Sequence, residues 1–130
     1  MDFALTDDQQ ALQETARRFA QTEIAPVAAH YDQSGEFPRD IIQRAWELGL
    51  SSTCIGQDYG GVGLSSVDNC LITEELAWGC SGFTTSIMAN DLGLMPIVIA
   101  GSEDQKKEWL GWASASFRLI AFCLSEPNAP

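Results

Sequence analysis

The residues 76–101 read LAWGCSGFTTSIMANDLGLMPIVIAG, and this stretch decides the fold. Its only charged side chain is Asp91, whereas the flanking stretches carry a charge every few residues. An apolar run of this kind is expected to form the buried middle of a domain. It is long enough to suggest a membrane span, but Asn90, Asp91, the internal glycines and Pro96 argue against one. We therefore predict no membrane span and a central helical segment.

Two residues inside this stretch predict a break. Gly93 lowers helix propensity, and Pro96 removes a backbone donor. The pattern therefore predicts two short helices, roughly 81–92 and 96–100.

Three consecutive hydroxyls, those of Thr84, Thr85 and Ser86, lie in the same apolar run. A buried hydroxyl needs a hydrogen-bond partner. Each could bond back to the carbonyl four residues earlier, or part of this helix could line a pocket. The residues alone leave both interpretations open.

Composition and charge restrict the class of protein. The chain has 130 residues, 45% of them hydrophobic, which suits one domain with a real core rather than disorder. Seven basic and 18 acidic residues give a formal net charge of −11. This charge excludes a general nucleic-acid binder and disfavours attraction to anionic membranes, because phosphates and anionic lipid headgroups repel an acidic chain.

The cysteines predict neither a metal site nor a disulfide framework. Cys54, Cys70, Cys80 and Cys123 form no C-x-x-C spacing, and the single histidine, His30, is far from all of them in sequence. A zinc site is therefore not predicted. The acidic N-terminus lacks an apolar signal core, so we expect free thiols in a reducing compartment.

Local signals mark the remaining elements. Capping boxes begin helices at Thr6 and Ser102, and Ser65 or Ser66 caps another. Pro38 suits the first turn of a helix, whereas 31–35 has the composition of a turn.

The end of the chain carries a different pattern. Residues 119–124, LIAFCL, are a short apolar run typical of a buried strand. A single strand leaves its backbone donors and acceptors without partners, and no partner strand is evident upstream. We therefore predict an all-α fold, a bundle of about six helices, with one C-terminal strand that begins a missing middle β domain. The helical domain would span 1–117, and 118–130 would start the β domain.

Seven short motifs, in this order and spacing, carry a family resemblance. They are APVAA at 25–29, RAWELGL at 44–50, YGGVG at 59–63, EELA at 74–77, LGLMPI at 92–97, GSEDQKK at 101–107 and AFCLSEP at 121–127. The chain resembles the N-terminal helical domain of an acyl-CoA dehydrogenase, closest to the medium-chain type.

The resemblance implies a function for a longer parent enzyme. Such a subunit has an N-terminal helical domain, a middle β domain and a C-terminal helical bundle, with FAD and the acyl-CoA between them. It oxidises acyl-CoA to trans-2-enoyl-CoA in fatty-acid β-oxidation and passes electrons to an electron-transferring flavoprotein. The resemblance also implies a homo-oligomer. The medium-chain base lies far downstream, so no catalytic residue is assigned to this chain.

Site residues follow from the resemblance one by one. The resemblance implies that Phe122, Leu124 and Ser125 fall where the family contacts the flavin. The chemistry is compatible, since backbone amides of an extended segment can donate to the ring carbonyls. The family often has Tyr and Thr where Phe122 and Ser125 stand, so the hydroxyl survives only at Ser125. Residues 128–130 depart from the glycine-rich continuation of the family signature.

The acyl pocket is expected on the apolar stretch. The family lines it at the positions of Thr84, Thr85, Met88 and Leu92, whose spacing of three to four residues puts Thr84 or Thr85, Met88 and Leu92 on one helix face. Met88 stands where the medium-chain pattern often has Glu, which makes the pocket floor more apolar and more deformable.

Further expectations concern the activity, the cofactor binding and the location of the chain. The chain alone should be inactive and should not hold FAD. A stand-alone helical protein-interaction module without catalysis is the alternative. We expect a bacterial cytoplasmic location, with the mitochondrial matrix as the alternative.

Overall fold

The computed structural model describes residues 4–125 and Pro127. Within these residues the chain forms six helical stretches and one short 3₁₀ turn, and it contains no strand. The all-α prediction is therefore confirmed. Continuous stretches join some elements: the π-turn η1 follows α1 directly, and α6, η3 and α7 succeed one another without a gap. The elements are α1 Asp7–Phe19, η1 Ala20–Ile24, α2 Ala28–Ser34, α3 Arg39–Glu47, η2 Gln57–Tyr59, α4 Ser66–Gly79, α5 Ser81–Ala100, α6 Glu103–Gln105, η3 Lys106–Leu110 and α7 Gly111–Ala115.

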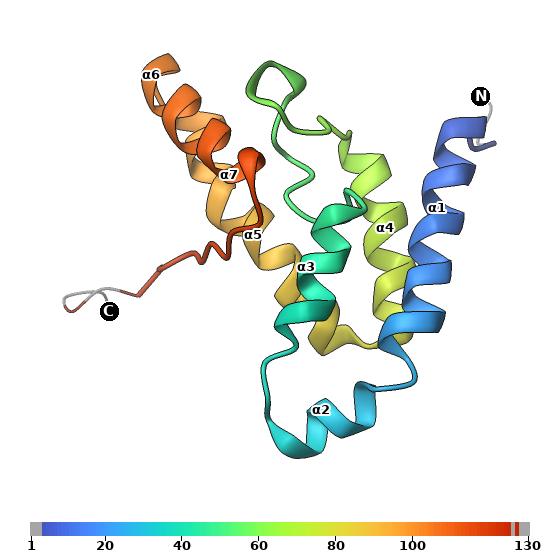
Figure 1. Cartoon of the computed structure of the whole chain (residues 1–130). Helices are drawn as coiled ribbons and strands as arrows, with labels where there is room; N and C mark the ends of the chain where they lie inside the picture. The colour runs from blue at the N-terminus through green and yellow to red at the C-terminus, as the bar shows by residue number, and fades with distance from the viewer. Residues whose placement is uncertain (1–3, 126, 128–130) are drawn as a thin grey trace.

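Helix α5 is central to the arrangement. It begins beside the ends of α4 and α2 and runs across the bundle to α6 (Figure 1). By length and composition α5 is the one helix among the described residues that could cross a membrane. Its polar residues Asn90 and Asp91, however, are buried and bonded to other elements of the domain.

The main hydrophobic core lies where α1, α3 and α4 meet the first half of α5. Fully buried side chains from each of these elements contact one another there. They include Phe19, Ile42, Ile72, Leu76 and Ile87. Burial of side chains of this size stabilises a fold by about 1.5–3 kcal/mol each before the entropy cost is counted. This core fixes the orientation of α5.

A half-buried ion pair links α1 to α4. The Arg17 guanidinium donates to both carboxylate oxygens of Glu75, at 2.9 and 2.7 Å. The Glu75 side chain is 8% exposed, whereas that of Arg17 is 49% exposed. The bidentate geometry compensates the burial of the carboxylate. Glu75 therefore has a structural role, and its neighbour Glu74 is exposed.

A second, smaller core holds the other half of α5. Ile55 from the loop after α3, Leu94, Leu110 and Ala113 are buried together. The loop closes tightly here: a Cβ on Gly61 would lie 2.1 Å from the Ile55 carbonyl oxygen, so only glycine fits at this position. The glycine-rich stretch is therefore a close-packed connecting loop.

Two predictions of local structure are wrong. Helix α5 is continuous from Ser81 to Ala100 with Pro96 inside it, rather than two helices. Proline costs a helix one hydrogen bond, and packing on both cores outweighs that cost. The expected turn at 31–35 is the end of α2, where Tyr31 packs edge-to-face on Phe83 with ring centroids 5.3 Å apart.

Residues 119–124, which were predicted to form a strand, have no regular secondary structure. Residues 119–124 follow α7, pass α5 and leave the bundle (Figure 1). No strand partner for them exists in the described part of the chain. The domain boundary at 117–118 stays a prediction.

Candidate functional site

The outer face of α5 is uncharged because its one charge points inward. Asp91 is buried, whereas Leu92 and Ile99, seven residues apart, are 59% and 74% exposed. Residues at this spacing lie on the same side of a helix. The outer face is therefore an apolar surface with no titratable side chain.

Three of the four predicted pocket residues lie on or beside this face. Thr85 and Leu92 are exposed, and Met88 between them is half-buried. Thr84 is instead buried toward the core, because it lies one position around the helix from Thr85. The structure thus places Thr85, Met88 and Leu92 on or beside the outer face and Thr84 on the core side of the helix, next to the half-buried Met88.

All three hydroxyls at the start of α5 bond back into their own helix. Thr84 Oγ1 donates to the Cys80 carbonyl at 3.0 Å and Thr85 Oγ1 to that of Ser81 at 3.0 Å. Ser86 Oγ donates to the Gly82 carbonyl at 3.2 Å. The local explanation for these hydroxyls is confirmed, and the pocket role of Thr84 and Thr85 stays a prediction.

The predicted flavin residues lie on the extended C-terminal segment. Phe122 is 44% exposed, Leu124 is 75% exposed, and Ser125 is also exposed. An exposed, extended backbone of this kind can present its amide groups and the Ser125 hydroxyl to the edge of a planar ring. These exposed residues are free to contact another group, and contact with a flavin stays a prediction.

Sequence reasoning missed two residues of the inner face, Asn90 and Asp91. Asp91 Oδ1 accepts hydrogen bonds from Thr53 Oγ1 at 3.2 Å and from the Cys54 N–H at 2.7 Å. Its other oxygen, Oδ2, is buried without a hydrogen-bond partner. The signal for both residues was present: they form the one strongly polar pair in the apolar stretch. Their partners lie too far away in sequence to be read from spacing.

The buried carboxylate suppresses the chemistry of a neighbouring thiol. Burial, together with the negative charge and hydrogen bonding of Asp91, raises the pKa of Cys54 to about 12. A thiol held protonated is a poor nucleophile. Cys54 is therefore a structural residue and not a reactive one.

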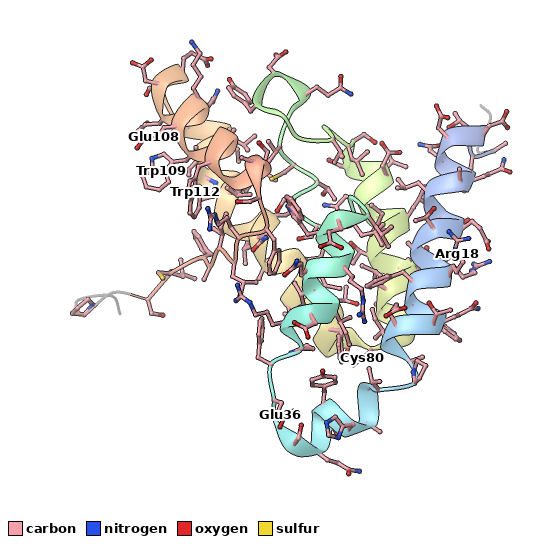
Figure 2. All side chains as sticks on the ribbon, viewed as in Figure 1. Arg18, Glu36, Cys80, Glu108, Trp109 and Trp112 are labelled. Atoms are coloured by element: carbon pink, nitrogen blue, oxygen red, sulfur yellow. The ribbon has the colours of Figure 1, made fainter. Side chains whose placement is uncertain are left out.

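A separate cavity lies at the N-terminal end of α5. It has a volume of about 320 Å³ and lies between α2, the α2–α3 loop and the first turns of α5. Aromatic side chains form much of its wall, and it includes Ser86 but none of the predicted pocket residues. Its lining is Ala28, Tyr31, Asp32, Gly35, Glu36, Phe37, Pro38, Cys80, Gly82, Phe83 and Ser86. Figure 2 shows Cys80 and Glu36 on this side of the molecule.

These features define a helical domain that presents an uncharged helix face and an extended chain segment for contacts with other groups. A family model described as "Acyl-CoA dehydrogenase, N-terminal domain" matches residues 6–115. The chain belongs to the acyl-CoA dehydrogenase family, as its N-terminal domain.

Individual relatives agree with this assignment. The chain is 40% identical over 129 residues to a probable medium-chain specific acyl-CoA dehydrogenase 2, mitochondrial, of Caenorhabditis briggsae. That match covers 99% of this chain and 32% of the relative. The chain therefore spans about a third of the length of this curated relative.

Solved structures show the same fold. Butyryl-CoA dehydrogenase from Megasphaera elsdenii matches with a TM-score of 0.85 and 33% identity, over 100% of this chain and 35% of that one. An acyl-CoA dehydrogenase complexed with FAD from Bacillus anthracis matches with a TM-score of 0.83 and 31% identity, over 97% of this chain and 22% of that one.

Proposed function

We propose that this chain is the N-terminal domain of an FAD-dependent acyl-CoA dehydrogenase that oxidises acyl-CoA to trans-2-enoyl-CoA. The observation that carries the proposal is the uncharged outer face of α5, with Thr85, Met88 and Leu92, on a chain that belongs to this family. An acyl chain is apolar along its length, and a face without charges receives it without the cost of burying an ion.

The residues of this chain have binding and positioning roles in the proposal. Thr85, Met88 and Leu92 form one wall of the acyl pocket, and Phe122, Leu124 and Ser125 contact the flavin. The bound FAD would supply an acceptor for the hydride of the substrate β-carbon. The complex of a relative with FAD supports this choice of cofactor. The base that removes the α-proton is assigned to the part of the parent enzyme beyond this domain.

The proposed partners are acyl-CoA, an electron-transferring flavoprotein and further copies of the parent subunit. The relatives come from a nematode mitochondrion and from bacteria. The bacterial cytoplasm and the mitochondrial matrix thus both stay predictions. The helical domain is proposed to span 1–117.

A domain exchange tests the function. This chain would replace the matched N-terminal third of the M. elsdenii butyryl-CoA dehydrogenase, and the purified chimera would be examined by visible absorption. We expect retained flavin colour that is bleached by acyl-CoA. The chain alone, incubated with FAD and passed through gel filtration, should emerge colourless and should not reduce an electron acceptor.

Two leucine variants of the chimera make the test specific. Leu92→Lys places a charge on the proposed pocket face and should abolish bleaching by acyl-CoA while FAD is retained. Leu48→Lys is the matched control, because Leu48 is 52% exposed at the end of α3. A folded, colourless chimera would support the interaction-module alternative, and equal bleaching in both variants would remove Leu92 from the pocket.

A further inference from the structure

The side-chain amide of Asn90 bonds to the backbone of the C-terminal segment. Its Nδ2 donates to the Arg118 carbonyl at 2.8 Å, and its Oδ1 accepts from the Ile120 N–H at 2.8 Å. Nδ2 also donates to Ser52 Oγ at 3.1 Å. Asn90 is 2% exposed, so these bonds are made in a desolvated environment where losing a partner is costly.

The two bonds to the segment flank Leu119. One goes to the carbonyl of the residue before it and the other comes from the N–H of the residue after it, as a neighbouring parallel strand would supply them. Asn90 therefore takes the place of a strand partner for this part of the segment. Leu119 itself is left 41% exposed.

Gly93, one turn further along α5, allows the segment to lie against the helix. A Cβ at Gly93 would lie 2.7 Å from Ile120 Cγ2 and 3.1 Å from the Ala121 carbonyl carbon. Both distances are shorter than ordinary van der Waals contact, so a side chain at this position would push the segment away. A cation–π contact also holds the segment: the Arg118 guanidinium lies 4.9 Å from the centre of the Trp112 ring. Figure 2 labels Trp112, on α7.

We propose that Asn90 is a positioning residue that holds the flavin-contacting residues 122–125 in register with the acyl-pocket face of α5. This inference rests on the proposed function. Met88 and Leu92 lie two residues to either side of Asn90 on the same helix, and the bonds of Asn90 end two residues before Phe122. A helix packed in two cores is rigid, so one amide sets the distance between the pocket wall and the flavin segment.

Amide hydrogen exchange on the chain itself tests the contact. In Asn90→Leu, the Ile120 N–H loses its acceptor and should exchange at least about tenfold faster, because the segment can turn to water. Thr53→Val is the matched control, since it removes a hydrogen bond to the neighbouring Asp91 without touching the segment. Equal exchange at Ile120 in the two variants would overturn the inference.

The chimera with the M. elsdenii enzyme tests the positioning role. Asn90→Leu should weaken FAD binding by about tenfold and shift the visible flavin spectrum, whereas Thr53→Val should change neither. Asn90→Asp keeps the acceptor for Ile120 but loses the donor to Arg118. Its FAD affinity should therefore lie between that of the wild-type chimera and that of the Asn90→Leu chimera. A wild-type chimera that binds FAD, with Asn90→Leu unchanged in affinity and spectrum, would overturn this inference alone. A folded wild-type chimera that binds no FAD would overturn the proposed function and this inference with it.

Discussion

At the scale of single residues, the Asp91 carboxylate determines the local electrostatics of α5. It has no cationic partner among the contacts that the structure describes, and it is held by the Thr53 hydroxyl and the Cys54 amide. Two hydrogen bonds to one oxygen are a substitute for solvation of a buried charge. The buried charge also acts on the neighbouring Cys54 thiol, whose raised pKa keeps it in the protonated form.

Alkylation rates of Cys54 should report this coupling. In the wild-type chain Cys54 should react far more slowly than the exposed Cys70 and Cys123, and its rate should still be rising at about pH 10. Asp91→Asn removes the negative charge, so the rate profile of Cys54 should move to lower pH. The shift should be partial, because burial is the largest cause of the raised pKa.

The measurement is mass-spectrometric quantification of iodoacetamide labelling at each cysteine across a pH series. Cys70 and Cys123 serve as internal controls in every sample. Identical Cys54 profiles in the wild type and in Asp91→Asn would contradict the prediction.

At the scale of elements, the helix ends were predictable and the helix interior was not. Thr6, Ser65 and Ser102 each form the complete capping box, because a capping box involves only residues three apart. The continuity of α5 through Pro96 depends on two cores contributed by distant segments. Local propensity cannot include that packing.

The relative positions of the candidate site residues were predictable to the same limited extent, whereas their roles stay predictions. The spacing of Thr85, Met88 and Leu92 correctly placed them close together, since a helix repeats locally. Thr84 differs because the core lies on its side of the helix. The bonds from Asn90 to residues 118 and 120 span 28 and 30 positions, and no local pattern encodes such pairs.

Pro96 should lower the stability of α5, and none of the described contacts requires a proline at this position. It removes the hydrogen bond that residue 96 would donate to the Leu92 carbonyl. Pro96→Ala should therefore raise the free energy of unfolding by about 1–3 kcal/mol. Urea unfolding followed by circular dichroism measures the change, with Ile99→Ala as the control for an exposed position on the same helix. A less stable Pro96→Ala variant would contradict the prediction.

The capping box at the start of α4 should make the free energy of unfolding depend on pH in the acid range. The Ser65 hydroxyl, with further bonds from Gln9 and the Ser65 backbone, holds the pKa of Asp68 below its ordinary value of 3.8. A lowered folded-state pKa contributes stability that is complete above the unfolded value and is lost as pH falls through the folded value. The loss should therefore begin near pH 3.8 and continue below it.

Asp68→Asn tests this linkage. Asparagine cannot titrate, so the variant should lose less stability than the wild type as pH falls below about 4. Ser65→Ala removes the largest cause of the shift and should flatten the same acid limb. Urea midpoints measured between pH 6 and pH 2.5 provide the comparison, and parallel curves for all three proteins would refute it.

At the scale of the whole molecule, charge and apolar surface act against each other. The net charge of −11 repels a second copy of the chain. The outer face of α5 and residues 119–124 expose large apolar side chains, which favour association. Because salt screens charge repulsion and leaves apolar contacts intact, salt decides the balance.

We expect the isolated chain to self-associate, and more strongly as the salt concentration rises. Sedimentation velocity at low and high salt measures the dimer fraction. Leu92→Lys and Ile99→Lys should shift the chain toward monomer, whereas Leu48→Lys, on α3, should not. A wild-type chain that stays monomeric at high concentration and high salt would contradict the prediction.

The hydrogen bonds of the Asn90 amide have a consequence for the order in which the parts of the protein are expected to form during synthesis. This amide supplies the backbone of residues 118–120 with the partners that a later strand would otherwise provide. The bonds between α5 and residues 118–120 can therefore form once Ile120 has left the ribosome, while anything encoded downstream is still being translated. Domains made first generally fold first. In the proposed parent enzyme, the β domain would then assemble against a surface that is already formed, so the direction of translation would also be the direction of assembly.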